Sequence, residues 1–196
     1  MDLLSAYLPM DRRQALYRNE PLPERTAGAA IFADISGFTP LTEMLSRELG
    51  PQRGAEELTH HLNQVYDAII NQLHRFGGSV IGFSGDAITC WLDGDDGGRA
   101  VACALAMQAA MRTFNQMKTA AGTMVSLELK TAVSVGNVRR FLVGDPTMQV
   151  IEVLCGEPLD RLAAAEHHAG RGEVVVDGKT AALMEGLLVL GERRGG

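Results

Sequence analysis

The chain carries at positions 29–39 the stretch Ala29-Ala30-Ile31-Phe32-Ala33-Asp34-Ile35-Ser36-Gly37-Phe38-Thr39. Its apolar first part predicts a buried β-strand, and this strand ends in a carboxylate followed by a Ser-Gly turn. Such a strand end brings one acidic side chain and several backbone N–H groups to one edge of a sheet. These groups are suited to holding a divalent metal ion together with a polyphosphate.

A second acidic residue follows an apolar segment further along the chain, in Val80-Ile81-Gly82-Phe83-Ser84-Gly85-Asp86-Ala87. If this hairpin lies beside the strand that ends at Asp34, the two carboxylates would form a two-metal site. Each acid also has a plainer interpretation. Asp34 could cap the helix that follows it, and Asp86 could serve only the hairpin turn. The occurrence of both favours the metal site.

The composition is that of one globular domain. The chain has 196 residues, of which 46% are hydrophobic and 21% charged, enough to bury a single core. Its net charge of −6 and lack of a basic run argue against nucleic-acid binding. The three cysteines lie in apolar surroundings, which is typical of reduced core cysteines in a reducing compartment. No apolar stretch reaches the roughly 20 residues of a membrane span, and no signal peptide is present, so we expect a cytoplasmic protein without membrane contact.

Helices and strands alternate along the chain. Helices are predicted at 2–18 (interrupted by Pro9), 40–48, 53–76, 99–117, 156–168 and 179–186. Strands are predicted at 28–34, 79–83, 87–92, 127–135, 138–143, 150–154 and 173–176, with a hairpin turn at Gly136-Asn137, and the segment 187–190 is also strand-like. This order fits an α+β fold with a ferredoxin-like βαββαβ core and extra elements. We divide the chain into an N-terminal helix and lead-in (1–25), one domain (26–190) and the start of a linker to a further region (191–196).

Three segments carry a resemblance to a known family. They are Phe32-Ala33-Asp34-Ile35-Ser36-Gly37-Phe38-Thr39, the helix start Arg53-Gly54-Ala55-Glu56, and Phe76-Gly77-Gly78 through Phe83-Ser84-Gly85-Asp86-Ala87. Together they resemble the class III nucleotidyl cyclases, and most of all the first catalytic domain of bicarbonate-responsive soluble adenylyl cyclases and their bacterial relatives. The resemblance runs from about residue 26 to about residue 180.

The resemblance implies a set of site residues. In that family two aspartates hold two divalent ions, Mg²⁺ or Mn²⁺, around the triphosphate of ATP. Asp34 and Asp86 match these catalytic positions, with Ile35 as a further metal ligand. The segment Ile35, Ser36, Gly37, Phe38 and Thr39 matches the turn that cradles the phosphates, and Lys130 matches a basic residue that contacts phosphate. From its sequence context alone, Lys130 is equally well interpreted as a solvated strand residue.

Several family positions are changed in this chain. The residue that reads the purine edge in the family is replaced here by Gly82. We expect ATP rather than GTP as the nucleotide, but no side chain at this position enforces that preference. The Asn and Arg that orient the ribose and stabilise the transition state are replaced by Asp160 and Ala164. Arg161 is close in sequence but lies on another face of the helix. Gly82 and Ala163 also occupy bicarbonate-binding positions, so stimulation by bicarbonate is not expected.

The resemblance therefore implies a cyclase domain that holds only the metal-binding half of its site. Class III sites form where two domains meet, so we expect a second cyclase domain, in cis or in trans, to supply the other half; a homodimer would lack it. The isolated chain should form little cyclic AMP and pyrophosphate from ATP. The alternative is a degenerate cyclase domain that binds nucleotide, or regulates an attached module, without turnover.

Overall fold

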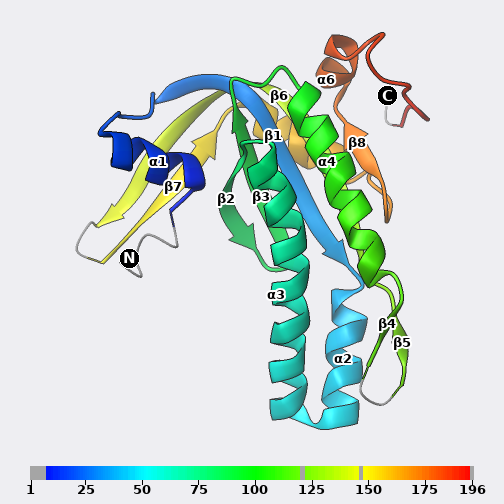
Figure 1. Ribbon diagram of the computed structural model, residues 1–196. Helices are drawn as coiled ribbons and strands as arrows, with labels where there is room; N and C mark the ends of the chain where they lie inside the picture. Colours follow the sequence, from blue (N-terminus) through cyan, green and yellow to red (C-terminus); the bar gives the residue numbers. More distant parts are fainter. Residues whose placement is uncertain (1–7, 120–121, 146–147, 195–196) are drawn as a thin grey trace.

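The computed structural model describes residues 8–119, 122–145 and 148–194 of the chain. Its centre is an antiparallel sheet in the order β2-β3-β1-β6-β7, with β8 added in parallel to β6 (Figure 1). The strands are β1 (Arg25–Ser36), β2 (Ser79–Ser84), β3 (Ala87–Asp93), β6 (Glu128–Asp145), β7 (Gln149–Cys155) and β8 (Val174–Val176). Strands β4 (Met117–Lys118) and β5 (Met124–Val125) form a separate two-stranded ribbon.

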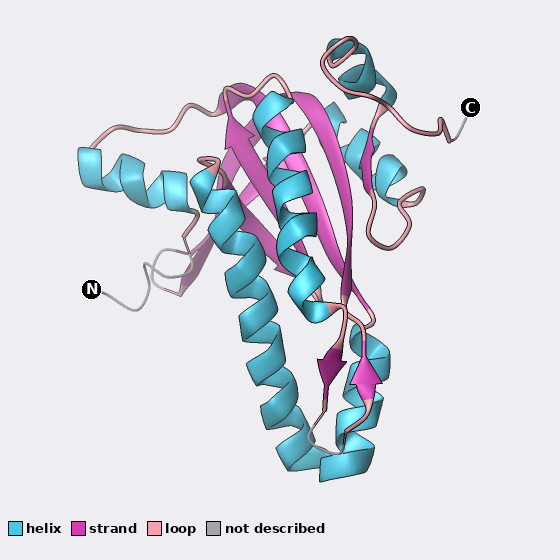
Figure 2. Ribbon diagram, turned by 45° about the vertical axis from the view of Figure 1, so that its right-hand side comes forward, coloured by secondary structure: helices cyan, strands magenta, loops and turns pink. Residues whose placement is uncertain are grey.

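Helices α2 (Phe38–Leu49), α3 (Pro51–Arg75) and α4 (Gly98–Met111) are the helical elements that connect the core strands. Helices α3 and α4 lie over the same face of the sheet, and α3 extends beyond the sheet together with α2 (Figures 1 and 2). In α3, apolar side chains recur at three- and four-residue steps, so that one stripe faces the sheet. Val65, Ile69 and Leu73 from this stripe are fully buried in the main core.

The opposite face of the sheet carries a smaller core under α5 (Glu157–Glu166). Its buried members are Ala30, Trp91, Ala132, Val138, Leu162 and Ala165. The remaining helical elements are α1 (Met10–Arg18), η2 (Arg112–Phe114) and α6 (Gly178–Leu183). None of the described helices is both long and apolar enough to cross a membrane.

The predicted ferredoxin-like core is confirmed. In chain order it runs β1, α2 with α3, β2, β3, α4 and β6, and these four strands lie side by side in the order β2-β3-β1-β6. All three of their contacts are antiparallel. The two central strands, β1 and β3, consequently hold the segments next to Asp34 and Asp86 in direct contact.

The predicted hairpin at Gly136-Asn137 is wrong. Strand β6 continues through these residues as one strand of 18 residues. Gly136 pairs with Gly28 of β1 and Asn137 with Ala27, so both keep their places in the ladder. A Cβ atom at Gly136 would lie 2.7 Å from the side chain of Pro158. The glycine is therefore required by the close packing of α5 and not by a turn.

Three further predictions differ from the structure. Helix α4 ends at Met111 instead of 117, because a short 3-10 turn and strand β4 follow it. The predicted N-terminal helix begins only at Met10, directly after Pro9, and residues 1–7 lie outside the described part. The strand-like segment 187–190 forms no strand, apart from an isolated bridge between Glu185 and Leu188.

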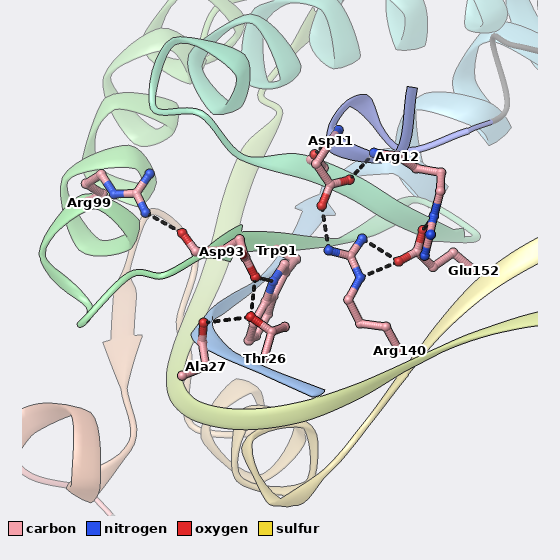
Figure 3. A network of polar contacts seen from close by, with 10 residues as sticks. Asp11, Arg12, Thr26, Ala27, Trp91, Asp93, Arg99, Arg140 and Glu152 are labelled. Carbon is pink, nitrogen blue, oxygen red and sulfur yellow. Dashed lines mark hydrogen bonds and ion pairs between the residues drawn. The ribbon is translucent and has the colours of Figure 1, made fainter. Parts of the chain in front are cut away.

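Helix α1 is attached to the sheet by a network of charged side chains (Figure 3). Arg140 of β6 forms an ion pair with Asp11 of α1 at 2.6 Å and another with Glu152 of β7. Arg12 of α1 reaches the same Glu152 at 3.0 Å. The N–H of Asp11 also donates to the hydroxyl of Ser79 at 2.9 Å. Because Arg140 and Glu152 are almost fully buried, each charge depends on its partners.

Candidate active site

Asp34 lies near the end of β1, in the middle of the sheet. In the strand register it stands opposite Ala87 of β3 on one side and Lys130 of β6 on the other. Directly opposed residues of antiparallel strands point to the same face of the sheet. Lys130 and Asp34 therefore point to the same face of the sheet. This position is the one that Lys130 would need in order to contact a phosphate bound near Asp34.

Asp86 lies in the turn between β2 and β3. Gly85, the residue before it, has a φ of +64°, which favours glycine. The backbone N–H of Ile35 donates to the carbonyl oxygen of Asp86 at 3.3 Å. This bond joins the turn to β1 directly after Asp34. The structure thus brings together the two acidic segments that the sequence places far apart.

The surroundings of Asp34, above all its partial burial, disfavour its ionised form. Partial burial raises the pKa of Asp34, the negative charges of Asp86 and Glu166 raise it further, and Lys130 lowers it. The net shift is upward. Two carboxylates that repel each other in a half-buried position are stabilised when a cation lies between them. The electrostatics of the pair therefore fit a divalent metal ion.

The composition of the site limits which metal it can hold. Among the described residues, no group of three or more His, Cys, Asp or Glu side chains is close enough to bind a metal ion. A metal ion at Asp34 and Asp86 would need further ligands from backbone carbonyls, water or phosphate oxygens, and the sequence predicts the Ile35 carbonyl as one of them. Mg²⁺ is commonly bound in this way, through one or two carboxylates, water and substrate phosphates.

The predicted phosphate-binding segment spans the junction of β1 and α2. Ile35 and Ser36 end the strand, Gly37 is the N-cap of α2, and Phe38 and Thr39 form its first turn. Gly37 has a φ of +97°, and a Cβ atom there would lie 2.5 Å from the carbonyl oxygen of Ser126. No described side chain caps α2. Its first N–H groups are thus available to an anion, whereas the N–H of Ile35 is already bonded to Asp86.

One polar atom in this segment has an unsatisfied hydrogen-bonding capacity. The Ser36 hydroxyl is buried and has no hydrogen-bond partner in the part of the chain that the structure describes. Buried hydroxyl groups are normally bonded, and leaving one without a partner costs about 1–3 kcal/mol. The hydroxyl lies two residues after Asp34, so a ligand oxygen bound at this strand end could satisfy it.

Two residues at the site were not predicted from sequence. The Tyr66 hydroxyl of α3 donates to the carbonyl oxygen of Gly85 at 3.3 Å, and its ring packs edge-on against Phe83. Burial raises the pKa of Tyr66, as do the charges of Asp86 and Asp34. The sequence could have indicated Tyr66, because it is a tyrosine within the apolar stripe of α3. The second residue is Glu166 at the end of α5, whose charge raises the pKa of Asp34. No feature of the sequence indicated Glu166.

The structure also places the changed purine-reading and transition-state positions. Gly82 lies at an irregularity in the β2–β3 pairing, and a Cβ atom there would contact nothing within 4 Å. Asp160 and Ala164 are exposed on α5. Arg161 is occupied elsewhere, donating to the carbonyl of Val135 at 2.6 Å and to Asp177 at 3.2 Å. These contacts agree with the prediction that Arg161 lies on another face of the helix than the changed position Ala164.

The whole sequence was compared with known protein families and with curated proteins. No family model matches it. It is 27% identical over 161 residues to adenylate cyclase type 10 of Mus musculus, and 26% identical over 157 residues to the Homo sapiens protein of that name. These alignments cover 79% and 80% of the chain. The chain spans only about a tenth of the length of these relatives, 10% of each.

Solved structures give a consistent result. The adenylyl cyclase CyaB from P. aeruginosa matches with a TM-score of 0.68 and 25% identity, covering 82% of this chain and 81% of that one. The guanylyl cyclase Cya2 matches with a TM-score of 0.67 and 26% identity, covering 81% and 78%. A bacterial light-regulated adenylyl cyclase has a TM-score of 0.72 over 92% of this chain and 53% of its own, but at 16% identity it shows the fold alone.

Proposed function

Because the chain is homologous to adenylate cyclase type 10 and to class III adenylyl and guanylyl cyclase domains, we propose that it is a cyclase domain carrying the metal-binding half of a shared active site. The family resemblance inferred from its motifs is confirmed by both comparisons. The proposed reaction is that of a phosphorus–oxygen lyase, from ATP to cyclic AMP and pyrophosphate. The observation that carries the proposal is the junction of the Asp34 and Asp86 segments through the Ile35 hydrogen bond.

In this proposal, different residues of the site bind the metal ions and the phosphates. Asp34 and Asp86, with the carbonyl oxygen of Ile35, would hold Mg²⁺ or Mn²⁺. When bound, two such ions lower the pKa of the attacking ribose hydroxyl and neutralise phosphate charge. The first N–H groups of α2 would receive the phosphates, because the positive end of a helix favours anions. Lys130, opposite Asp34 in the register, would contact a phosphate oxygen.

The other half of the site would come from a second cyclase domain. Asp160 and Ala164 cannot supply the amide and guanidinium groups of complete family members, and Arg161 is held by Val135 and Asp177. Removing one positioned charge-stabilising donor typically lowers the rate by about 10²–10³-fold. The isolated chain should therefore bind the metal–nucleotide complex but convert it very slowly.

Calorimetric titration tests the metal half directly. The purified chain is titrated with Mn²⁺ and a non-cyclisable ATP analogue, beside Asp34→Asn and the control Asp67→Asn, which changes an exposed carboxylate of α3. We expect the wild-type chain and the control to bind alike, and Asp34→Asn to lose binding. Equal binding by all three proteins would contradict the proposed metal site.

A second candidate function is nucleotide binding without turnover, in which the domain regulates an attached module. The exposed Asp160 and Ala164 favour it, because they leave the chain without a transition-state half of its own. Both functions share the metal site, so the titration does not separate them. A product assay on the full-length protein does, since only a cyclase forms cyclic nucleotide.

A further inference from the structure

An open cavity of about 580 Å³ lies at the start of β1, at the other end of this strand from Asp34. Its lining combines three neighbouring strand segments with the residue that precedes α5. Arg25, Asn137, Arg139, Cys155 and Gly156 are among its lining residues. None of them belongs to the candidate active site. The cavity is therefore separate from the candidate active site.

The strand register aligns three of these residues in one row. Arg25 of β1 stands opposite Arg139 of β6, and Arg139 stands opposite Cys155 of β7. All three side chains consequently lie on one face of the sheet. Like charges placed directly opposite each other destabilise a strand pair. Both arginines are exposed, and an anion bound between them would relieve this repulsion.

Neither arginine has an ion-pair partner in the part of the chain that the structure describes. Arg139 lies over the ring of Phe141, with 5.1 Å between its guanidinium carbon and the ring centroid. This stacking uses the face of the guanidinium group and leaves its N–H edge free to donate. In a chain of net charge −6, two unpaired arginines side by side mark a local positive potential.

The N-cap of α5 also lines the cavity, but it adds little to this potential. Gly156 is the N-cap of this ten-residue helix, and no described side chain caps it. The first turn carries two carboxylates, that of Glu157, which pairs with Arg161, and that of Asp160. The helix packs on the face of the sheet that carries Val138, and Arg139, the next residue of β6, points to the other face. The two arginines therefore supply most of the positive charge at the cavity.

We propose that this cavity binds a small oxyanion, a phosphate or carboxylate group held between the guanidinium groups of Arg25 and Arg139 beside the Cys155 thiol. Guanidinium groups bind both kinds of anion through paired N–H···O hydrogen bonds. The inference is independent of the proposed cyclase function, because the site lies away from Asp34 and Asp86. It does not require a metal ion or a second domain.

Cys155 provides a built-in reporter for this site. The sequence predicts three core cysteines, which is correct for the buried Cys90 and Cys103 but wrong for Cys155, which is exposed at the end of β7. Burial raises the pKa of Cys90, and it raises the pKa of Cys103 to about 12, which keeps both as unreactive thiols. Thiol labelling of the folded chain therefore follows Cys155 alone.

The experiment compares two thiol reagents on the folded full chain. One is the dianionic disulfide dithiobis-nitrobenzoate, which forms a mixed disulfide and releases a thiolate, and the other is the neutral reagent N-ethylmaleimide. Arg25→Met and Arg139→Met are measured beside Arg171→Met, which removes an exposed arginine outside the cavity. We expect each cavity variant to lower the anionic-to-neutral rate ratio about three- to tenfold, and Arg171→Met to leave it unchanged.

Competition then identifies the anion. Inorganic phosphate and succinate are each added against sodium chloride of the same ionic strength. Saturable protection of Cys155 from the anionic reagent in the wild-type chain, lost in Arg25→Met and Arg139→Met, supports the site. The protecting anion identifies phosphate or carboxylate as the ligand group. Protection by neither anion, or a rate ratio that the two cavity variants do not change, would overturn the proposal.

Discussion

The backbone N–H of Ile35 donates a hydrogen bond to the carbonyl oxygen of Asp86 at 3.3 Å. This bond fixes the β2–β3 turn against β1 at the residue that follows Asp34. The backbone segments that carry the two carboxylates are thereby held together by a main-chain contact. Such preorganisation lowers the cost of assembling a metal site.

The first prediction concerns the stability of the metal-free chain. Asp34 has a raised pKa, so the folded state binds more protons than the unfolded state just above the ordinary carboxyl pKa of 3.8. Its contribution therefore favours folding at low pH and is lost as the pH rises through the raised pKa. At neutral pH, Asp34→Asn should increase stability, by up to about 1 kcal/mol because the group is partly exposed and screened.

Thermal unfolding with and without Mn²⁺ measures this effect. We expect Asp34→Asn to have the higher Tm without metal and to show no increase on adding Mn²⁺, whereas the wild-type chain is stabilised by metal. A lower Tm for Asp34→Asn in metal-free buffer would show that the carboxylate has a stabilising role in the fold.

The second prediction concerns the hydroxyl of Tyr66. Tyr66→Phe removes only the donor to the Gly85 carbonyl and keeps the ring contact with Phe83. The loss should cost about 0.5–1.5 kcal/mol of stability. It should also weaken Mn²⁺ binding several-fold, because the turn that carries Asp86 becomes less restrained. Tyr17→Phe, at a fully exposed tyrosine, is the matched control. Unchanged metal affinity would mean that Tyr66 serves packing alone.

The third prediction concerns the emptied purine position. A Cβ atom at Gly82 would contact nothing within 4 Å, so Gly82→Lys should fold with a stability within about 0.5 kcal/mol of wild type. If the position reads the base as in the family, the variant should favour ATP over GTP analogues more strongly than the wild-type chain does. Competition titrations with both analogues measure this, and an unchanged ratio would exclude Gly82 as the base-reading position.

The fourth prediction concerns the charges that hold α1. Arg140→Met leaves Glu152 buried with only Arg12 as its partner, so it should cost about 3–5 kcal/mol. The double change Arg140→Met with Glu152→Met should cost less than the two single changes added together, because neither of the two most buried charges is then left without the other. Urea denaturation of the single and double variants measures the coupling. Additive costs would mean that the two side chains act independently.

The core of the fold could be predicted from local patterns. The apolar run before Asp34 and the helical spacing of Val65, Ile69 and Leu73 each reflect burial on one face, and such patterns are visible in a sequence. The continuation of β6 through Gly136-Asn137 was not predictable in this way. Glycine and asparagine favour turns, and only the approach of Pro158 explains why a glycine is needed in a strand.

The candidate site could be predicted in part. Asp34 and Asp86 each end an apolar run, which is a local signal, and their segments are indeed joined in the structure. The contributions of Tyr66 and Glu166 depend on how α3 and α5 cross the sheet, which no local pattern reports. The row formed by Arg25, Arg139 and Cys155 likewise depends on register between strands distant in sequence.

The central claim is that this chain carries the metal-binding half of a cyclase site and lacks the transition-state half. Cyclic nucleotide formation by the purified chain with Mn²⁺ and ATP tests it most directly, beside the double variant Asp160→Asn with Ala164→Arg, whose positions are exposed on α5. The account predicts almost no product from the wild-type chain and a gain of about 10²-fold in the double variant, abolished by adding Asp34→Asn. Rapid turnover by the wild-type chain, lost in Arg161→Gln and unchanged in the double variant, would contradict it.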